Sequence, residues 1–460
     1  MSDWFEAEQL AERAHEHYEA GRWDQAAEAL RDAIALNPYQ AEWHFNLGLT
    51  LEAADRSADA AEAFARAAEL GADDPQTPLL VGVNLLRADR PADALPWLER
   101  AERADPPGVN AMLHRIEALA RLGRHDQAEV VFYLAQQLEP ENADLYAAMA
   151  DSLLDRGLHD KAVWCLREAA RLDPDLPRLN AKLAEGYAAT GRLERARQLY
   201  LKELREDPGD TDVLLDMADL LVDMNRHAEA GEKFRRVLEI QPDSPDAYFG
   251  LADLASRAGD RATARSHFDV VYRLDASFPE VRPRLAELLL DDRDPASLKR
   301  VRELLREELV ELDGPTKPEP EGATGLADLL LSAGLPGEAA SLMRGLLEQR
   351  PGMAEAHHLL SVALFQSGDL EAGMEEARAA LKADPQLVAA MHNLAVASLR
   401  SGRFTRARYW LGRALRVDSE DGVVRRLRAR LWLHTIASIA GIVTGPVRRL
   451  TSRGRRNADG

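Results

Sequence analysis

The sequence predicts an all-α protein, an α-α superhelix (solenoid) of about twelve helix-turn-helix repeats of 34 residues with a C-terminal capping helix. A period of this length is typical of a solenoid, in which each unit buries its apolar face only against its neighbours. The first observation is a glycine that recurs at multiples of 34 residues between two apolar-periodic stretches, at Gly21, Gly123, Gly157, Gly191 and Gly259, and in a later set at Gly334, Gly368 and Gly402. Glycine supplies the positive φ of a tight turn. The second is an alanine five residues later, and the third is a proline twelve residues beyond that in six of these repeats.

The repeats share a pattern of large and small residues. With the proline at position 32, repeats start at residues 7, 41, 75, 109, 143, 177, 211, 245 and 279, and three more start at 320, 354 and 388. Position 8 is small in eleven of the twelve, with Ile116 as the exception, and a small residue lets two helix backbones approach closely. Position 24 carries a bulky residue such as Phe64 or Phe234. This pattern resembles the tetratricopeptide repeat, and the resemblance covers residues 7–421.

The register divides the chain into four parts. Residues 7–312 hold repeats 1–9, residues 313–319 form a Pro-rich insert, residues 320–421 hold repeats 10–12, and residues 422–460 form an Arg-rich capping helix and tail. Repeat 9 loses register, since Leu298 stands where alanine belongs. We expect the insert to be a loop; a bend in the superhelix is the alternative.

Composition and motifs favour binding over catalysis. Twelve repeats occupy nearly all of the chain, and the sequence holds no GxxxxGK[ST], GxGxxG, HExxH or CxxC motif. We therefore expect a non-catalytic protein-protein interaction scaffold with no cofactor and no metal. Two alternatives stay open: a peripheral membrane-associated assembly factor anchored by the tail, and an accessory subunit of an enzyme system. The N-terminal residues lack the basic and apolar regions of a signal peptide, which predicts a cytoplasmic protein, peripheral at the membrane if the tail binds lipid.

Charge is distributed unevenly. The formal net charge is −20, but the tail from residue 422 has nine arginines and one aspartate, which leaves the body at −28. An acidic body repels phosphates and argues against nucleic acid. We expect proteins or peptides as partners, with basic or extended segments.

The resemblance implies that first-helix positions 2, 5, 9, 12 and 13 line a concave groove. Position 9 is a carboxylate in seven consecutive repeats, at Glu117, Asp151, Glu185, Asp219, Asp253, Glu287 and Asp328. Position 13 adds Asp155, Asp223 and Asp291. An acid in the last turn of a helix costs roughly 0.3–1 kcal/mol, and residues that break a local rule are where function is expected. We interpret these residues as the acidic centre of a partner-binding groove; the alternative is the solvated face of an acidic protein.

The two ends of the groove are different. Phe45 and Leu49 at one end, and His358, Phe365 and His392 at the other, are candidate contacts, because apolar residues on a solvent-facing surface usually mark an interaction. A terminal element that packs there is the alternative. His358 and His392 share position 5, where a metal or phospho-ligand role is less favoured than a half-exposed groove residue. Asn393 matches one position of the family's chaperone-tail clamp, but the required neighbours are missing, which predicts no clamp.

The tail begins with an apolar pattern. Val424, Leu427 and Leu431 stand at helical spacing and predict a cap on the last repeat. Residues 431–447 are apolar but interrupted by polar residues, glycine and proline, so we expect no spanning helix. The flanking arginines suit an anionic membrane surface, with residues 435–456 in peripheral contact, and occupation of the acidic groove is the alternative.

Overall fold

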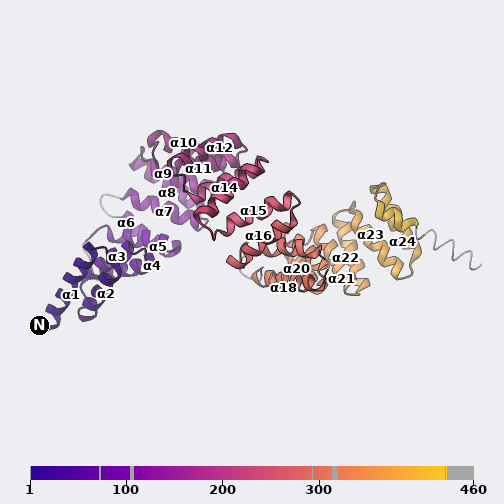
Figure 1. Cartoon of the computed structure of the whole chain (residues 1–460), viewed down its shortest axis with the longest axis horizontal. Helices are drawn as coiled ribbons and strands as arrows, with labels where there is room; N and C mark the ends of the chain where they lie inside the picture. Colours follow the sequence, from indigo (N-terminus) through magenta and orange to yellow (C-terminus); the bar gives the residue numbers. More distant parts are fainter. Residues whose placement is uncertain are drawn as a thin grey trace, which may run out of the picture. The chain divides into compact units, whose positions relative to one another are not determined.

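The computed structural model describes residues 2–71, 74–103, 108–292, 294–312, 320–429 and 431. These residues form α-helices joined by short turns, with no strand among them. The chain divides into two compact units, Met1–Pro242 (unit 1) and Asp243–Gly460 (unit 2). The prediction of an all-α chain of paired helices is confirmed, and Figure 1 shows the pairs along each unit.

Unit 1 contains seven helix pairs within the described residues. The first helices of the pairs are α1 (Ser2–Glu19), α3 (Ala41–Ala53), α5 (Thr77–Arg87), α7 (Val109–Arg121), α9 (Ala143–Asp155), α11 (Leu179–Ala189) and α13 (Thr211–Asp223). The second helices are α2 (Trp23–Leu36), α4 (Ser57–Glu69), α6 (Pro91–Glu102), α8 (His125–Leu138), α10 (His159–Leu172), α12 (Leu193–Glu206) and α14 (His227–Ile240).

Unit 2 contains five pairs in its described part. The first helices are α15 (Pro245–Arg257), α17 (Val281–Leu290), α19 (Pro320–Ser332), α21 (Ala354–Gln366) and α23 (Val388–Arg400). The second helices are α16 (Arg261–Leu274), α18 (Pro295–Leu312), α20 (Pro336–Gln349), α22 (Leu370–Ala383) and α24 (Phe404–Val417). Residues 422–429 are also helical.

The turn inside each pair has the conformation that the glycines predict. Gly123 has φ 67°, and the turn closes through Gly123 N–H to Ala120 O and Arg124 N–H to Leu119 O, both 2.8 Å. This pair of bonds satisfies carbonyls at the helix end that would otherwise lack a partner. Asp55, Asp89 and Asn225 hold the same turn position in repeats without the glycine, and they also have positive φ. Asp and Asn tolerate this conformation better than other non-glycine residues.

The small residue at position 8 is required by close helix packing. A Cβ on Gly48 of α3 would lie 2.6 Å from the Phe64 ring of α4, and one on Gly82 of α5 would lie 2.5 Å from Leu98 of α6. Phe64 is fully buried. The expected pairing of a small residue at position 8 with a bulky one at position 24 is therefore present in repeat 2.

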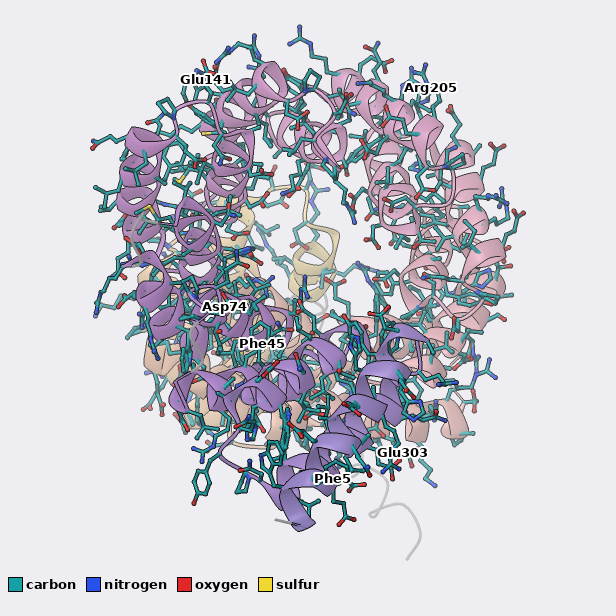
Figure 2. All side chains as sticks on the ribbon, turned by 90° about the vertical axis from the view of Figure 1, so that its left-hand side faces the viewer. Phe5, Phe45, Asp74, Glu141, Arg205 and Glu303 are labelled. Atoms are coloured by element: carbon teal, nitrogen blue, oxygen red, sulfur yellow. The ribbon has the colours of Figure 1, made fainter. Side chains whose placement is uncertain are left out.

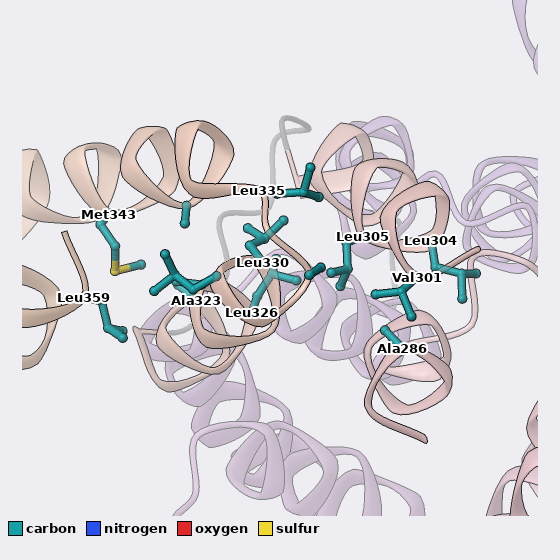
Figure 3. Packing of buried hydrophobic residues seen from close by; sticks show 14 of the residues in the cluster. Ala286, Val301, Leu304, Leu305, Ala323, Leu326, Leu330, Leu335, Met343 and Leu359 are labelled. Atoms are coloured by element: carbon teal, nitrogen blue, oxygen red, sulfur yellow. The ribbon is translucent and has the colours of Figure 1, made fainter. Parts of the chain in front are cut away.

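Core packing in unit 2 continues across the predicted insert. One apolar cluster extends from Ala252 to Leu364 and includes Leu305 of α18 and Leu326 of α19, on either side of it (Figure 3). Residues 313–319 themselves lie outside the described residues. α18 has 18 residues, against 14 in α16 and α20, so the second helix of repeat 9 is longer than its neighbours. The apolar core is therefore continuous from repeat 9 to repeat 10.

The helix after α24 caps the last repeat, as predicted. Val424 is fully buried and Leu431 is nearly so, and both belong to the apolar cluster that contains Leu411 and Ala414 of α24. Residues 430 and 432–460, with the predicted membrane-contact segment, lie outside the described residues. Within the described part of the chain, no helix combines the length and the apolar character needed to span a bilayer.

Candidate functional site

The acids that the sequence singled out in unit 1 lie on successive first helices, and none is buried. Glu117 lies on α7, Asp151 and Asp155 on α9, Glu185 on α11, and Asp219 and Asp223 on α13. The structure adds Asp216, also on α13 and exposed. We call these seven residues the acidic row. Glu141 and Arg205, in contrast, lie at the outer edge of this unit (Figure 2).

The middle of the acidic row concentrates negative charge. The pKa of Glu185 is raised because the surrounding protein partly shields its carboxylate from water, and raised further by the charges of Asp216, Asp151 and Asp155, while Lys182 opposes the shift. The pKa of Asp216 is also raised, because the surrounding protein partly shields its carboxylate from water; Arg178 opposes the shift and Asp212 adds to it. Carboxylates influence one another in this way only when they are close, because water screens distant charges. The row is therefore one electrostatic unit across α9, α11 and α13.

Basic residues compensate part of the row. Lys182 Nζ of α11 donates to Asp151 Oδ2 at 2.7 Å, yet burial still raises the pKa of Asp151. At Glu117 the balance is reversed, since the hydrogen bond from His114 and the charge of Arg121 lower its pKa. Sequence reasoning missed Asp216 and Lys182 because it considered other positions. Both stand at position 6 of their repeats, and that shared position was the available signal.

A hollow of about 490 Å³ lies between α7 and α9 and reaches the start of α11. Its lining includes four acids, Glu117, Asp144, Asp151 and Asp155, two bases, Arg121 and Lys182, and apolar residues such as Leu113 and Ala147. We call it the α7–α9 hollow. A lining that combines acidic and apolar residues suits a segment that has both basic and apolar side chains.

The acids predicted in unit 2 form a less continuous set. Asp253 pairs with Arg257 and Asp291 with Arg261, each at 2.6 Å. Glu287 and Asp328 are exposed. Since two of these four carboxylates already have a basic partner, unit 2 offers less free negative charge than the acidic row.

The apolar candidates at the N-terminal end belong partly to the core. The rings of Phe45 and Phe64 meet edge to face at 5.4 Å between centroids, and Phe45 and Leu49 are both half-buried. Trp4 and Phe5 of α1 are 55% and 60% exposed. Phe45 therefore has a packing role as well as an exposed edge.

At the C-terminal end, Phe365 and His392 line a hollow of about 510 Å³ between α21 and α23. We call it the α21–α23 hollow. Beside it, Asn393 Nδ2 donates to His358 Nδ1 at 3.3 Å, and burial lowers the pKa of His358 while Asp328 opposes that shift. Among the described residues, no group of three or more His, Cys, Asp or Glu side chains is arranged to hold a metal ion.

Comparison with protein families identifies the chain. The model described as "Tetratricopeptide repeat" matches residues 12–75, 82–143, 147–211, 215–279 and 324–388, more than half of the chain, and a second model of the same description matches residues 364–431. The chain belongs to the tetratricopeptide repeat family, whose members are usually non-catalytic. The first model's matches stop at residue 279 and resume at 324, leaving out repeat 9 and the insert.

The chain resembles several solved structures in fold only. TTC0263, a thermophilic tetratricopeptide repeat protein of Thermus thermophilus, is 26% identical, covers 40% of this chain and 100% of its own, and has a TM-score of 0.36. Yeast Tom70 is 16% identical over 97% of this chain and 99% of its own, with a TM-score of 0.37. YrrB, described as a tetratricopeptide repeat protein with an unusual peptide-binding site, is 20% identical. The match covers 40% of this chain and 90% of YrrB, with a TM-score of 0.34. No curated protein matches this chain significantly.

Proposed function

We propose that the chain is a non-catalytic scaffold whose unit 1 binds a basic, extended segment of a partner protein along the acidic row. The observation that carries the proposal is the placement of Asp151 and Asp155 on α9, Glu185 on α11 and Asp216 on α13, close enough for the charges of the other three to act on Glu185. Negative charge collected on three successive helices attracts a cationic segment and stabilises it once bound. The absence of catalysis is part of the proposal and follows the usual role of the family.

The α7–α9 hollow supports an extended segment rather than a single basic residue. Asp144 and Asp155 line it at opposite ends of α9, and Asp216 on α13 continues the charge beyond it. A segment that follows these helices meets carboxylates repeatedly, while Leu113 and Ala147 accept its apolar side chains. The groove predicted from the sequence also includes four acids of unit 2, at Asp253, Glu287, Asp291 and Asp328. We assign these four acids a secondary role, because Asp253 and Asp291 already form ion pairs with arginines.

The test compares peptides and a charge-reversed protein. Two peptides blocked at both ends, equal in length and apolar content, carry either Lys or Glu at alternate positions, and fluorescence anisotropy measures their affinity for the full chain. We expect preference for the Lys peptide and a loss of affinity with added salt, because the screening length is about 8 Å at physiological ionic strength. Asp155→Lys with Glu185→Lys should weaken binding of the Lys peptide about tenfold or more.

The matched control makes the same charge change elsewhere in unit 1. Glu28 of α2 and Glu232 of α14 are exposed acids on second helices, and Glu28→Lys with Glu232→Lys should leave the affinity nearly unchanged. Equal loss in both double variants would reduce the effect to net charge and contradict a specific site. Equal affinity for the two peptides would contradict the proposal altogether.

A further inference from the structure

Four first helices end in arginine: α5, α7, α15 and α23. A cation in the last turn is favoured by the helix dipole, so the position alone needs no further explanation. Three of the four are neutralised by an acid at 2.6 Å: Arg87 by Glu52, Arg121 by Glu117, and Arg257 by Asp253. Within the described part of the chain, Arg400 of α23 forms no ion pair.

The difference lies at two positions. In α7 and α15 the acid stands four residues before the arginine, one helical turn away, where the two side chains meet. In α5 that position holds Val83, and the acid is Glu52 of α3, in the preceding repeat. For Arg400 these two places hold Val396 and Phe365, and neither can form an ion pair. The last repeat therefore combines an exposed guanidinium with an apolar neighbour, where comparable repeats combine it with a carboxylate.

Arg400 lines the α21–α23 hollow. Val362 and Phe365 of α21 and Val396 of α23 form apolar walls, and Gln366, His392 and Asn393 add polar groups. None of the described lining residues is acidic, whereas four acids line the α7–α9 hollow. The two hollows therefore have opposite charge preferences.

One wall of the α21–α23 hollow is held in place by packing. A Cβ on Gly373 of α22 would lie 2.6 Å from the Phe365 ring, so the ring rests directly against the α22 backbone. The missing side chain at Gly373 lets the ring withdraw toward α22. Phe365 thus presents a preformed apolar surface, which lowers the entropic cost of binding.

We propose that the α21–α23 hollow binds a segment of a partner protein in which a bulky apolar side chain stands next to Asp or Glu. The carboxylate pairs with Arg400, with Asn393 and Gln366 as neighbouring donors, and the apolar side chain packs on Val362, Phe365 and Val396. Charge complementarity selects this occupant, because the hollow offers a cation without an internal acid. This site lies in unit 2 and takes the opposite charge from the acidic row, so it stands apart from the proposed function.

The experiment uses the full chain and the blocked peptide Ser-Gly-Phe-Glu-Glu-Gly-Ser. Because both ends are blocked, only the side-chain carboxylates carry charge. Fluorescence anisotropy should show tighter binding of this peptide than of versions with Gln for Glu or Ala for Phe. Arg400→Gln should weaken it about tenfold. The matched control, Arg344→Gln, removes an exposed arginine of α20 and should leave the affinity unchanged.

A second variant tests the same idea without removing the arginine. Val396→Glu restores an acid one turn before Arg400, as in α7, and should abolish the preference for Glu over Gln in the peptide. Val396→Gln, which loses the apolar contact but adds no charge, should retain that preference. Circular dichroism verifies that the variants stay folded. Unchanged affinity in Arg400→Gln, or no measurable binding of the Phe-Glu-Glu peptide, would overturn the proposal. Neither result depends on what the acidic row of unit 1 binds.

Discussion

Arg282 of α17 lies with its Nη1 atom 3.0 Å from Glu308 Oε2 of α18, which places a 7% exposed guanidinium against the last turns of a long helix. Its Nη2 atom also reaches Glu311 at 3.2 Å. Glu308 is the fourteenth residue of α18, where the 14-residue helices α16 and α20 end, and Glu311 lies in the additional turn. The extra length of α18 thus adds a second acid to the partner that Arg282 already has in Glu308.

We expect Arg282→Ala to destabilise α17 and α18 by about 2–4 kcal/mol, because it leaves the half-buried Glu308 without its partner. Hydrogen exchange of the α18 amides measures this locally, which suits a repeat protein whose unfolding is not two-state. Arg284→Ala is the control, since its pair with Glu280 is exposed and contributes about 0–1 kcal/mol. Equal protection in the two variants would contradict a structural role for Arg282.

Two helical glycines should respond oppositely to alanine. Gly48→Ala should cost about 1–3 kcal/mol, because its Cβ would lie 2.6 Å from the Phe64 ring. Gly412→Ala on α24 meets no atom within 4 Å and should stabilise by up to about 1 kcal/mol through helix propensity. Thermal melts followed by circular dichroism compare the two, and the same sign in both would show that packing does not select the small residue at position 8.

Lowering the pH should weaken binding of a basic peptide to unit 1. The pKa values of Asp151, Glu185 and Asp216 are raised, so these groups take up protons at a higher pH than ordinary Asp and Glu side chains do. Protonation removes the charge that attracts the peptide, and the affinity measured by anisotropy should fall as the pH is lowered from neutral toward the carboxyl range. If the affinity stays constant as the pH is lowered to the ordinary pKa of Asp and Glu, the predicted role of these three carboxylates is wrong.

The same shifts have a defined effect on stability. A carboxyl with a raised folded-state pKa binds its proton more tightly in the folded chain, so these three groups favour folding more as pH falls through their raised pKa values. Glu117 has the opposite effect, because its pKa is lowered in the folded chain. It stabilises the fold at pH values above the ordinary glutamate pKa, and this stability is lost as the pH falls through the lowered pKa. Hydrogen exchange should therefore show α11 and α13 gaining protection under mild acid relative to α7.

Removing Lys182 should strengthen binding of a basic peptide by about two- to fivefold, because its ammonium group occupies Asp151 at 2.7 Å. Lys182→Gln tests this by anisotropy, and Lys161→Gln on α10 is the matched control, an exposed lysine of the same unit. A weaker affinity in Lys182→Gln would contradict the assignment of Asp151 to the peptide site.

The fold was largely predictable because its determinants are local. Gly123 and its equivalents define the turn, Pro140 and its equivalents end the second helix, and Gly48 opposite Phe64 sets the helix spacing within one repeat. Each depends on residues close together in the chain, so a 34-residue period repeats the same geometry. Val424 at helical spacing after α24 likewise predicted the cap.

The balance of charges at the site depends on contacts between repeats, which a period does not specify. The sequence by itself determined that carboxylates recur on the first helices, but only the tertiary structure decided that Lys182 neutralises Asp151 while Glu185 lies among further acids. The same holds for Arg282, whose buried guanidinium has acid partners only because α17 and α18 pack together and place Glu308 and Glu311 beside it. Helix periodicity decides which face a residue occupies, whereas pairing and burial depend on side chains that meet across helices from distant parts of the sequence.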